Sequence, residues 1–266
     1  MNVYKLLLHI VFSVVFLNVK AQVNLKLVDS LDFKSQKFDA FVGVDIHENL
    51  FFKKGNVLIK TKDTEQWEYA NFELGNITSV SLLNPLQILL FYKETNNIIL
   101  LDHFLSETRK IDLNNLPNPK VAEWVENAKN QEVWLYNNLN NQLELFNYQS
   151  LNSISTSIPL SKTPTSLAAN FNTVFVLFKD TIKTFNNYGT VLKDKKIDSI
   201  QKIQLQNNNL IGITKNKLIL LDKDLNTAFN IKKPKNTIKD FFVSHEKLYI
   251  YKESKLYKYI IELPLK

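Results

Sequence analysis

A short hydrophobic pattern recurs along this chain. A largely apolar stretch ends in a polar residue, a tight polar turn follows, and a second apolar stretch comes after the turn. The polar residues that close the six copies are Lys53, Lys93, Asn137, Lys179, Lys215 and Lys252. Successive copies are separated by 40, 44, 42, 36 and 37 residues. Repeats of this length predict an array of small sheets that bury their faces on one another.

Each of the first five repeats reads as four short strands. In the first repeat these strands are expected at residues 38–44, 49–52, 57–60 and 67–70. Helical periodicity is weak throughout, and asparagine, which tolerates left-handed backbone, is abundant between the strands while glycine is rare. Short strands separated by such turns predict an all-β protein.

The sixth repeat lacks a fourth strand at the C-terminus, whereas residues 23–31 form an extra strand at the N-terminus. A ring could close by pairing this strand with the last sheet, which would remove an exposed edge. The sequence therefore predicts a six-bladed β-propeller closed by an N-terminal strand. A seven-bladed propeller and a β-sandwich are the alternatives.

Four of the predicted third strands end in Asp or Asn. These residues are Asp102, Asn147, Asn186 and Asp222. Such side chains bond to backbone N–H groups just ahead of them and so begin a turn. We interpret them as turn residues, because calcium needs several oxygens converging on one point and these residues fall one per blade.

The first 21 residues have the features of a secretory signal peptide. Lys5 precedes an apolar run over residues 6–19, and Val19-Lys20-Ala21 suits a cleavage site. We expect cleavage after Ala21, leaving residues 22–266 as a single propeller domain without a membrane span. The chain has no cysteine, which excludes disulfides and thiol catalysis.

The formal net charge is +7, and Arg109 is the only arginine. Proteins that recognise nucleic acid favour arginine for their contacts, and export would separate this protein from cytoplasmic nucleic acid. Nucleic acid is therefore not an expected partner. A lysine-rich surface suits anionic partners such as acidic proteins or glycans.

The repeat arrangement resembles the WD40-like and quinoprotein-like propellers, although it lacks a repeated Trp-Asp dipeptide. The signal peptide ending in Lys-Ala-Gln and the stretch Asn84-Pro85-Leu86-Gln87-Ile88-Leu89-Leu90-Phe91-Tyr92 are similar to a family of exported propeller-like proteins from Bacteroidota. This resemblance implies a periplasmic or outer-membrane-associated protein, with the cell surface also open. It implies no particular reaction.

The candidate binding residues are the lysines that close the second strands, together with two tryptophans. In a propeller these turns emerge on one face, so Lys53, Lys93, Lys179, Lys215 and Lys252 would form a ring of cations there. Solvated lysines that protect strand edges are the alternative interpretation. Trp67 and Trp124 lie near segment ends and are the surface aromatic candidates, whereas Trp134 is expected in the core.

No catalytic or metal site is predicted, and no cofactor. His47 and His245 occupy equivalent turns of the first and last repeats, but equivalent positions sit a blade apart, which is too far for one zinc ion. Hydrolase elbow and zinc-protease motifs are absent, and five glycines are too few for a phosphate loop.

The sequence favours a non-enzymatic, exported scaffold that binds another protein of the cell envelope. Two alternatives remain open at this point. The first is a carbohydrate-active or other hydrolytic propeller, and the second is a binder of anionic glycans through the lysine face.

Overall fold

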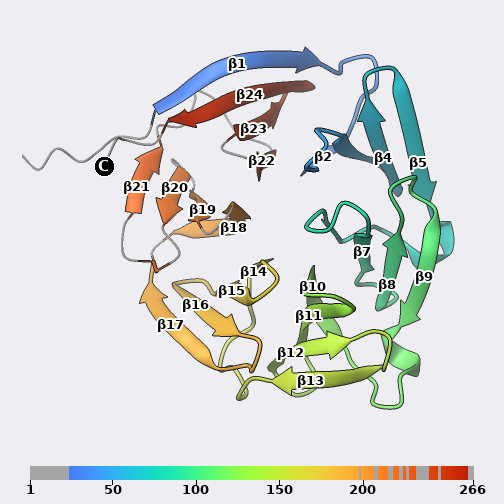
Figure 1. The fold of residues 1–266 in the computed structure, drawn as a ribbon, viewed down its shortest axis with the longest axis vertical. Coiled ribbons are helices and arrows are strands. Elements are labelled where there is room, and N and C mark those ends of the chain that lie inside the picture. The colour runs from blue at the N-terminus through green and yellow to red at the C-terminus, as the bar shows by residue number, and fades with distance from the viewer. Residues whose placement is uncertain are drawn as a thin grey trace, which may run out of the picture.

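Each repeat of the sequence forms one four-stranded antiparallel sheet, and the six sheets are arranged around a common axis (Figure 1). The structure is a computed structural model that describes residues 24–197, 199–206, 209–214, 218–221, 224–225, 228–231, 240–244 and 247–262. The predicted six-bladed β-propeller is therefore confirmed. The expected signal peptide lies outside the described residues.

The blades are numbered in chain order. Blade 1 consists of β2 (Ala40–Val44), β3 (Leu50–Lys54), β4 (Val57–Lys62) and β5 (Glu65–Ala70). Blade 2 consists of β6 (Ser79–Ser81), β7 (Ile88–Tyr92), β8 (Asn97–Leu101) and β9 (Glu107–Asp112). Blade 3 consists of β10 (Ala122–Asn127), β11 (Glu132–Asn137), β12 (Gln142–Asn147) and β13 (Asn152–Thr156).

The second half of the ring follows the same plan. Blade 4 consists of β14 (Ser166–Ala169), β15 (Thr173–Leu177), β16 (Thr181–Asn186) and β17 (Val191–Lys196). Blade 5 consists of β18 (Ile200–Gln206), β19 (Asn209–Thr214), β20 (Leu218–Leu221) and β21 (Ala228–Ile231). Blade 6 consists of β22 (Asp240–Ser244), β23 (Lys247–Lys252), β24 (Lys255–Glu262) and β1 (Asn24–Asp32).

The ring is closed by the N-terminal strand, as predicted. β1 is the outer strand of blade 6 and pairs antiparallel with β24, from Asn24 opposite Glu262 to Asp32 opposite Lys255. The two ends of the described chain thus belong to one sheet (Figure 1). The only helical segments in the described chain are two short 3-10 turns, Phe72–Leu74 and Leu113–Asn115, in links between blades.

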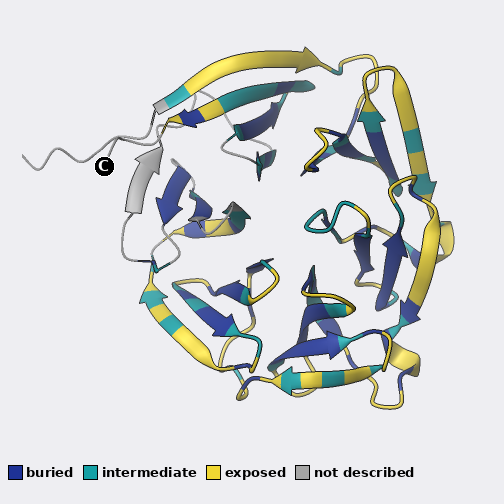
Figure 2. Cartoon of the chain, viewed as in Figure 1, coloured by how far each residue is buried: buried dark blue, intermediate teal, exposed yellow. Residues whose placement is uncertain are grey.

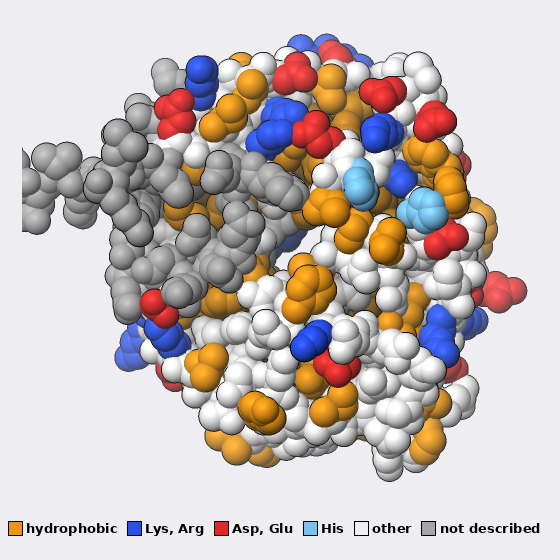
Figure 3. Space-filling view, viewed as in Figure 1, with side chains coloured by type: hydrophobic (Ala, Val, Ile, Leu, Met, Phe, Trp, Pro, Cys, Tyr) orange, Lys and Arg blue, Asp and Glu red, His pale blue; other side chains and the backbone are white. Residues whose placement is uncertain are grey.

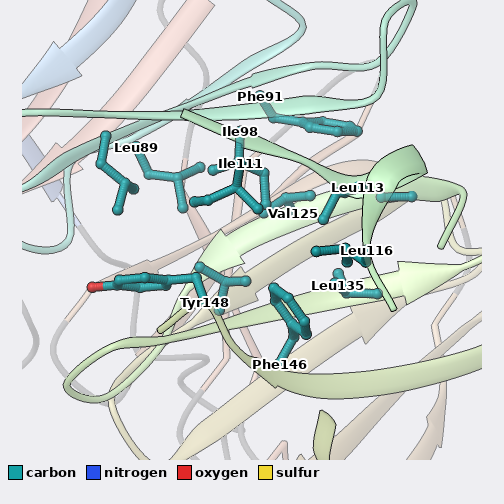
Figure 4. Close-up of a cluster of buried hydrophobic side chains, with 13 residues drawn as sticks. Leu89, Phe91, Ile98, Ile111, Leu113, Leu116, Val125, Leu135, Phe146 and Tyr148 are labelled. Carbon is teal, nitrogen blue, oxygen red and sulfur yellow. The ribbon is translucent and has the colours of Figure 1, made fainter. Parts of the chain in front are cut away.

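Buried apolar side chains form one cluster at each of the six interfaces between neighbouring blades. Figure 4 shows the cluster between blades 2 and 3, where Leu89 and Phe91 meet Val125 and Leu135. The alternate residues of the same strand, Leu90 among them, face blade 1 instead. Second strands are buried on both faces, so their sequences are continuous apolar runs rather than alternating ones.

Outer strands show the opposite pattern. In β5, β13 and β17 exposed and half-buried residues alternate, and Figure 2 shows exposed residues concentrated on the outer wall of the ring. One side of each outer strand covers the sheet interface, and the other meets solvent.

The Asp and Asn residues that end the third strands start turns, as interpreted from the sequence. The carboxylate of Asp102 accepts from the backbone N–H groups of Phe104 (2.8 Å) and Ser106 (2.9 Å). Asn147 and Asn186 accept from backbone groups two to four residues ahead in the same way. Asp222 lies outside the described residues.

Candidate binding channel

The six inner strands surround a central channel. A cavity of about 640 Å³ runs along the axis, and every blade contributes to its wall through β2, β6, β10, β14, β18 or β22 and the turns beside them. Figure 3 shows the hollow at the centre of one face. A cavity of this size can hold a small molecule or a protein side chain.

The two ends of the channel differ in chemistry. We call the end at which each inner strand turns into the second strand the AB face, and the opposite end the BC face. The consecutive strands of a blade are antiparallel, so the turns between third and fourth strands also lie toward the AB face. His47 and His103 belong to these two sets of turns. Histidine side chains are visible in Figure 3, which therefore views the AB face.

On the AB side the channel lining includes two acidic residues, Asp45 in the turn after β2 and, near the end of β10, Glu126. Burial raises its pKa to about 7, and the Ser81 hydroxyl and the Asn127 backbone N–H act in the opposite direction. The Asn127 N–H donates to Glu126 Oε1 over 3.1 Å. At neutral pH this carboxyl group is therefore divided between its protonated and ionised forms.

Ser81 and Trp124 also line the channel. Ser81 is 4% exposed, and its hydroxyl acts on the carboxyl of Glu126 without reaching full hydrogen-bond geometry to any group of the described chain. Trp124 is half-buried two residues before Glu126, so both side chains leave β10 on the same side. The indole N–H donates to the carbonyl of Pro164 over 2.9 Å. This bond holds the ring against blade 4, where it packs on the cluster between blades 3 and 4.

The BC side of the channel carries two lysines and an aspartate. Lys53 Nζ donates to the carbonyl of Ile77 over 3.0 Å, and Asp240 accepts from the Phe41 N–H over 3.3 Å. Burial lowers the pKa of Lys53, the carboxylate of Asp240 opposes this, and the charge of Lys202 adds to it. The negative charge of Asp240 thus offsets part of the positive charge of Lys53 and Lys202 at the BC end of the channel.

The lysines predicted to form a ring differ in their surroundings. Lys93 pairs with Glu123, and Lys252 pairs with Glu253 over 2.9 Å. Lys179 is exposed, and Lys53 faces the channel. Lys215 lies outside the described residues. Three of the four described lysines therefore have polar partners, and the ring as a joint binding surface stays a prediction.

The structure separates the two predicted tryptophans. Trp67 lies on the outer strand β5, with the Lys60 ammonium 4.7 Å from its ring centre and Lys60 in turn donating to the His103 carbonyl. Trp124 lies on an inner strand and lines the channel. They belong to different surfaces and cannot form one platform. Trp134 is fully buried, as expected.

His47 and His245 are the histidines whose equivalent turns raised the question of a metal site. His47 is exposed in its turn, and His245 lies outside the described residues. The described residues contain no group of three or more His, Asp or Glu side chains placed to hold a metal ion.

Glu126 and Ser81 were not identified from the sequence. The repeats do carry a signal. Blade 3 has a glutamate at the last but one position of its inner strand, where the other inner strands have Gly43, Val80, Ala168, Leu205 and Val243. Aligning the repeats by their inner strands would have revealed this position.

Comparison with known proteins finds similarity in structure only. No protein-family model matches the chain, and no curated protein matches its sequence. Among solved structures, a catalytically inactive virginiamycin B lyase from Staphylococcus aureus with quinupristin superimposes with a TM-score of 0.61 at 13% identity. The superposition covers 91% of this chain and 100% of the lyase chain.

Two further structures show the same arrangement. The Neurospora crassa Pan2 WD40 domain gives a TM-score of 0.58 at 9% identity, covering 86% of this chain and 76% of that chain. BamB from Moraxella catarrhalis gives a TM-score of 0.53 at 11% identity, and the match covers 89% of this chain and 99% of the BamB chain. These likenesses show a β-propeller fold. At these identities the likeness shows the fold alone.

No helix in the described part of the chain has the length and hydropathy of a membrane span.

Proposed function

We propose that this chain is an exported, non-enzymatic scaffold that binds another protein of the cell envelope through its AB face. A closed ring of sheets holds its turns rigidly, so little conformational entropy is lost when they bind a partner. The structural likeness to a WD40 domain and to BamB is compatible with a protein-binding role.

The observation that carries this proposal is a set of exposed apolar side chains in the turns of the AB face. They are Ile46 (54% exposed), Leu86 (70%), Phe104 (55%), Phe171 (46%) and Tyr188 (82%). Ile46 and Phe171 also line the channel, and Figure 3 shows hydrophobic side chains around its opening. Exposed apolar groups rimmed by polar ones are typical of protein-interaction sites.

Placement in the envelope is part of the same proposal. It is supported by the signal-peptide features of residues 1–21 and by the resemblance to exported Bacteroidota proteins. Sequencing the N-terminus of the protein recovered from the envelope fraction tests it. We expect the mature chain to begin at Gln22, and recovery of an uncleaved chain from the cytoplasm would contradict export.

The binding role is tested by co-purification from detergent-solubilised envelopes. The variant Phe171→Ser/Tyr188→Ser removes two apolar groups of the AB face. Its matched control, Ile154→Ser/Leu192→Ser, removes two apolar groups, 55% and 53% exposed, from the outer strands β13 and β17. We expect a specific envelope protein to co-purify with the wild type and the control but not with the AB-face variant. Equal recovery with both variants would exclude the AB face as the binding surface.

A further inference from the structure

Glu126 is half-buried, and it differs from Asp45 and Glu144, the buried carboxylates of the described chain, in how few partners it has. Asp45 accepts from the His47 and Asn49 N–H groups, each over 2.9 Å, and from the Asn49 side chain over 2.6 Å. Glu144 pairs with Lys120 over 2.6 Å and accepts from three further side chains. Within the described chain, Glu126 accepts a well-formed hydrogen bond only from the N–H of the next residue.

No charged side chain in the described chain compensates Glu126 either. Its pKa responds to burial, to the Ser81 hydroxyl and to the Asn127 N–H, and to no lysine, arginine, aspartate or glutamate. The channel lysines Lys53 and Lys202 lie toward the BC face, on strands of other blades. Carboxylates withdrawn from water are normally paired with a cation, whereas half-buried Glu126 has no counter-ion among the described residues.

Glu126 and the hydroxyl beside it suit a cation. An ammonium or guanidinium group carries several N–H donors and no acceptor, so it needs several acceptors around it. The buried Ser81 hydroxyl has unused acceptor capacity.

We propose that the AB mouth of the channel binds a single protonated amine or guanidinium group, which is presented by a lysine or arginine side chain of the partner protein. Glu126 supplies the negative charge, and Ser81 accepts a hydrogen bond. The identity of the presenting molecule rests on the proposed function, whereas the cation site itself belongs to the isolated chain.

Binding at this site is coupled to a proton. Below the pKa of Glu126 the cation meets a neutral carboxylic acid, so the acid O–H bond breaks, the proton passes to solvent, and the carboxylate pairs with the cation. Charge balances, because one cation enters as one proton leaves. Above the pKa the carboxylate is already ionised and no proton is released. Affinity for the cation therefore rises with pH through the range around 7.

Isothermal titration calorimetry on the intact protein tests this coupling. The probe is the tripeptide Gly-Arg-Gly, acetylated and amidated so that the side chain carries its only charge. The control probe replaces arginine with citrulline, which has nearly the same shape and no charge. Titration in buffers of different ionisation enthalpy counts the protons released. We expect the arginine peptide to bind at least about tenfold more tightly than the citrulline peptide. We also expect it to release close to one proton at about pH 6 and few at about pH 8.

Two matched variants locate the effect. Glu126→Gln keeps the shape and removes the charge, and we expect it to lose the preference for arginine and the proton release. Glu123→Gln makes the same change on the same strand, where the carboxylate already pairs with Lys93 at the other end of β10, and should bind as the wild type does. Equal affinity for both peptides, or arginine binding with proton release in Glu126→Gln, would overturn the proposal.

The outcomes separate this inference from the proposed function. If the wild type binds the arginine peptide with proton release but captures no envelope protein, the cation site stands and the scaffold role fails. If a partner is captured and the arginine peptide shows no charge-dependent binding, the cation site fails while the scaffold role stands.

Discussion

At the scale of single residues, two glutamates show how surroundings decide the behaviour of one functional group. Glu126 and Glu144 both lie in blade 3. Burial raises the pKa of Glu126 to about 7 because nothing compensates its charge. Burial acts in the same direction on Glu144, but hydrogen bonds from Lys120, Ser153 and two asparagines outweigh it and bring its pKa below the ordinary value. The difference comes entirely from partners on other strands.

We expect Glu126→Gln to stabilise the protein increasingly as pH rises. The folded-state pKa of Glu126 lies above its ordinary value of 4.5, so the native state holds the proton more tightly. Its ionisation therefore removes stability between about pH 4.5 and about pH 7, whereas glutamine stays neutral. The free energy of unfolding should rise by about 1–2 kcal/mol above pH 7. This is less than the full pKa shift of Glu126 implies, because its side chain is partly solvated. Urea unfolding of both proteins at about pH 5 and about pH 8 measures it, and a pH-independent difference would contradict the assigned titration.

We expect Lys120→Met to destabilise the protein by about 3–5 kcal/mol at neutral pH, because it leaves the Glu144 carboxylate buried without its cation. The double variant Lys120→Met/Glu144→Gln should recover much of this loss. Glutamine carries no charge and can still accept from Asn137 and Asn140. Chemical denaturation of the two variants and the wild type makes the comparison. A double variant no more stable than Lys120→Met would show that the lysine acts through packing alone.

Acid should weaken the same network. The pKa of Glu144 is lowered in the folded state, so the stability it contributes is present above its ordinary pKa of 4.5. This stability is lost as pH falls through the lower folded value. Unfolding curves recorded at several acid pH values should therefore converge for the wild type and Glu144→Gln. A difference that persists at the lowest pH would contradict this linkage.

At the scale of elements, the turns differ in how far they depend on their neighbours. Many turns use asparagine or another residue with a side chain at positive φ, such as Asn96, Asn130 and Asn141. Gly55 and Gly189 also have positive φ, at 56° and 75°, but their surroundings differ. A Cβ at Gly55 would meet nothing within 4 Å, whereas one at Gly189 would lie 2.4 Å from the backbone oxygen of Thr156 in blade 3.

We therefore expect Gly189→Ala to destabilise the protein considerably more than Gly55→Ala. The Gly55 change meets only the cost of left-handed backbone, about 1 kcal/mol. The Gly189 change adds a clash with backbone that cannot rotate away, for a total of roughly 3 kcal/mol or more. Thermal and urea unfolding of the two single variants provide the measurement. Equal losses of stability in the two variants would mean that the turn of blade 4 can move away from β13 at little energetic cost.

At the scale of the whole molecule, closure joins the two ends of the chain. β1 adds the outer strand of blade 6, and Leu25 packs against the cluster between blades 5 and 6. Blade 1 also contacts blade 6 directly, since the Tyr251 hydroxyl donates to the Phe38 carbonyl over 3.1 Å and Glu48 pairs with Lys247. Each blade buries its faces on two neighbours, so an opened ring exposes apolar surface and an unpaired strand edge.

We expect a chain that begins at Asn24 to unfold as cooperatively as the longer chain, and one that begins at Phe33 to lose cooperativity and associate. The second truncation removes β1 and leaves the edge of β24 unpaired. Size-exclusion chromatography and thermal unfolding compare the two truncations. A monomeric, cooperatively folded chain without β1 would show that closure by this strand is dispensable.

The spacing of apolar runs was enough to predict the number of blades, the strand order within a blade and the N-terminal closing strand. Each of these depends on patterns that are local in the chain and repeated, and burial on both faces imposes a continuous apolar run wherever a second strand lies. The sequence likewise identified Asp102, Asn147 and Asn186 as turn residues, because their hydrogen bonds reach only a few residues ahead.

The channel was decided by the tertiary structure alone. Glu126 comes from blade 3 and Ser81 from blade 2, and neither the missing counter-ion of one nor the unused hydroxyl of the other is visible in its own segment. The same holds for the predicted lysines, since Lys93 finds Glu123 thirty positions along the chain and Lys53 turns into the channel. Electrostatic environment depends on distances between segments and on exclusion of water, and these exist only once the blades have packed.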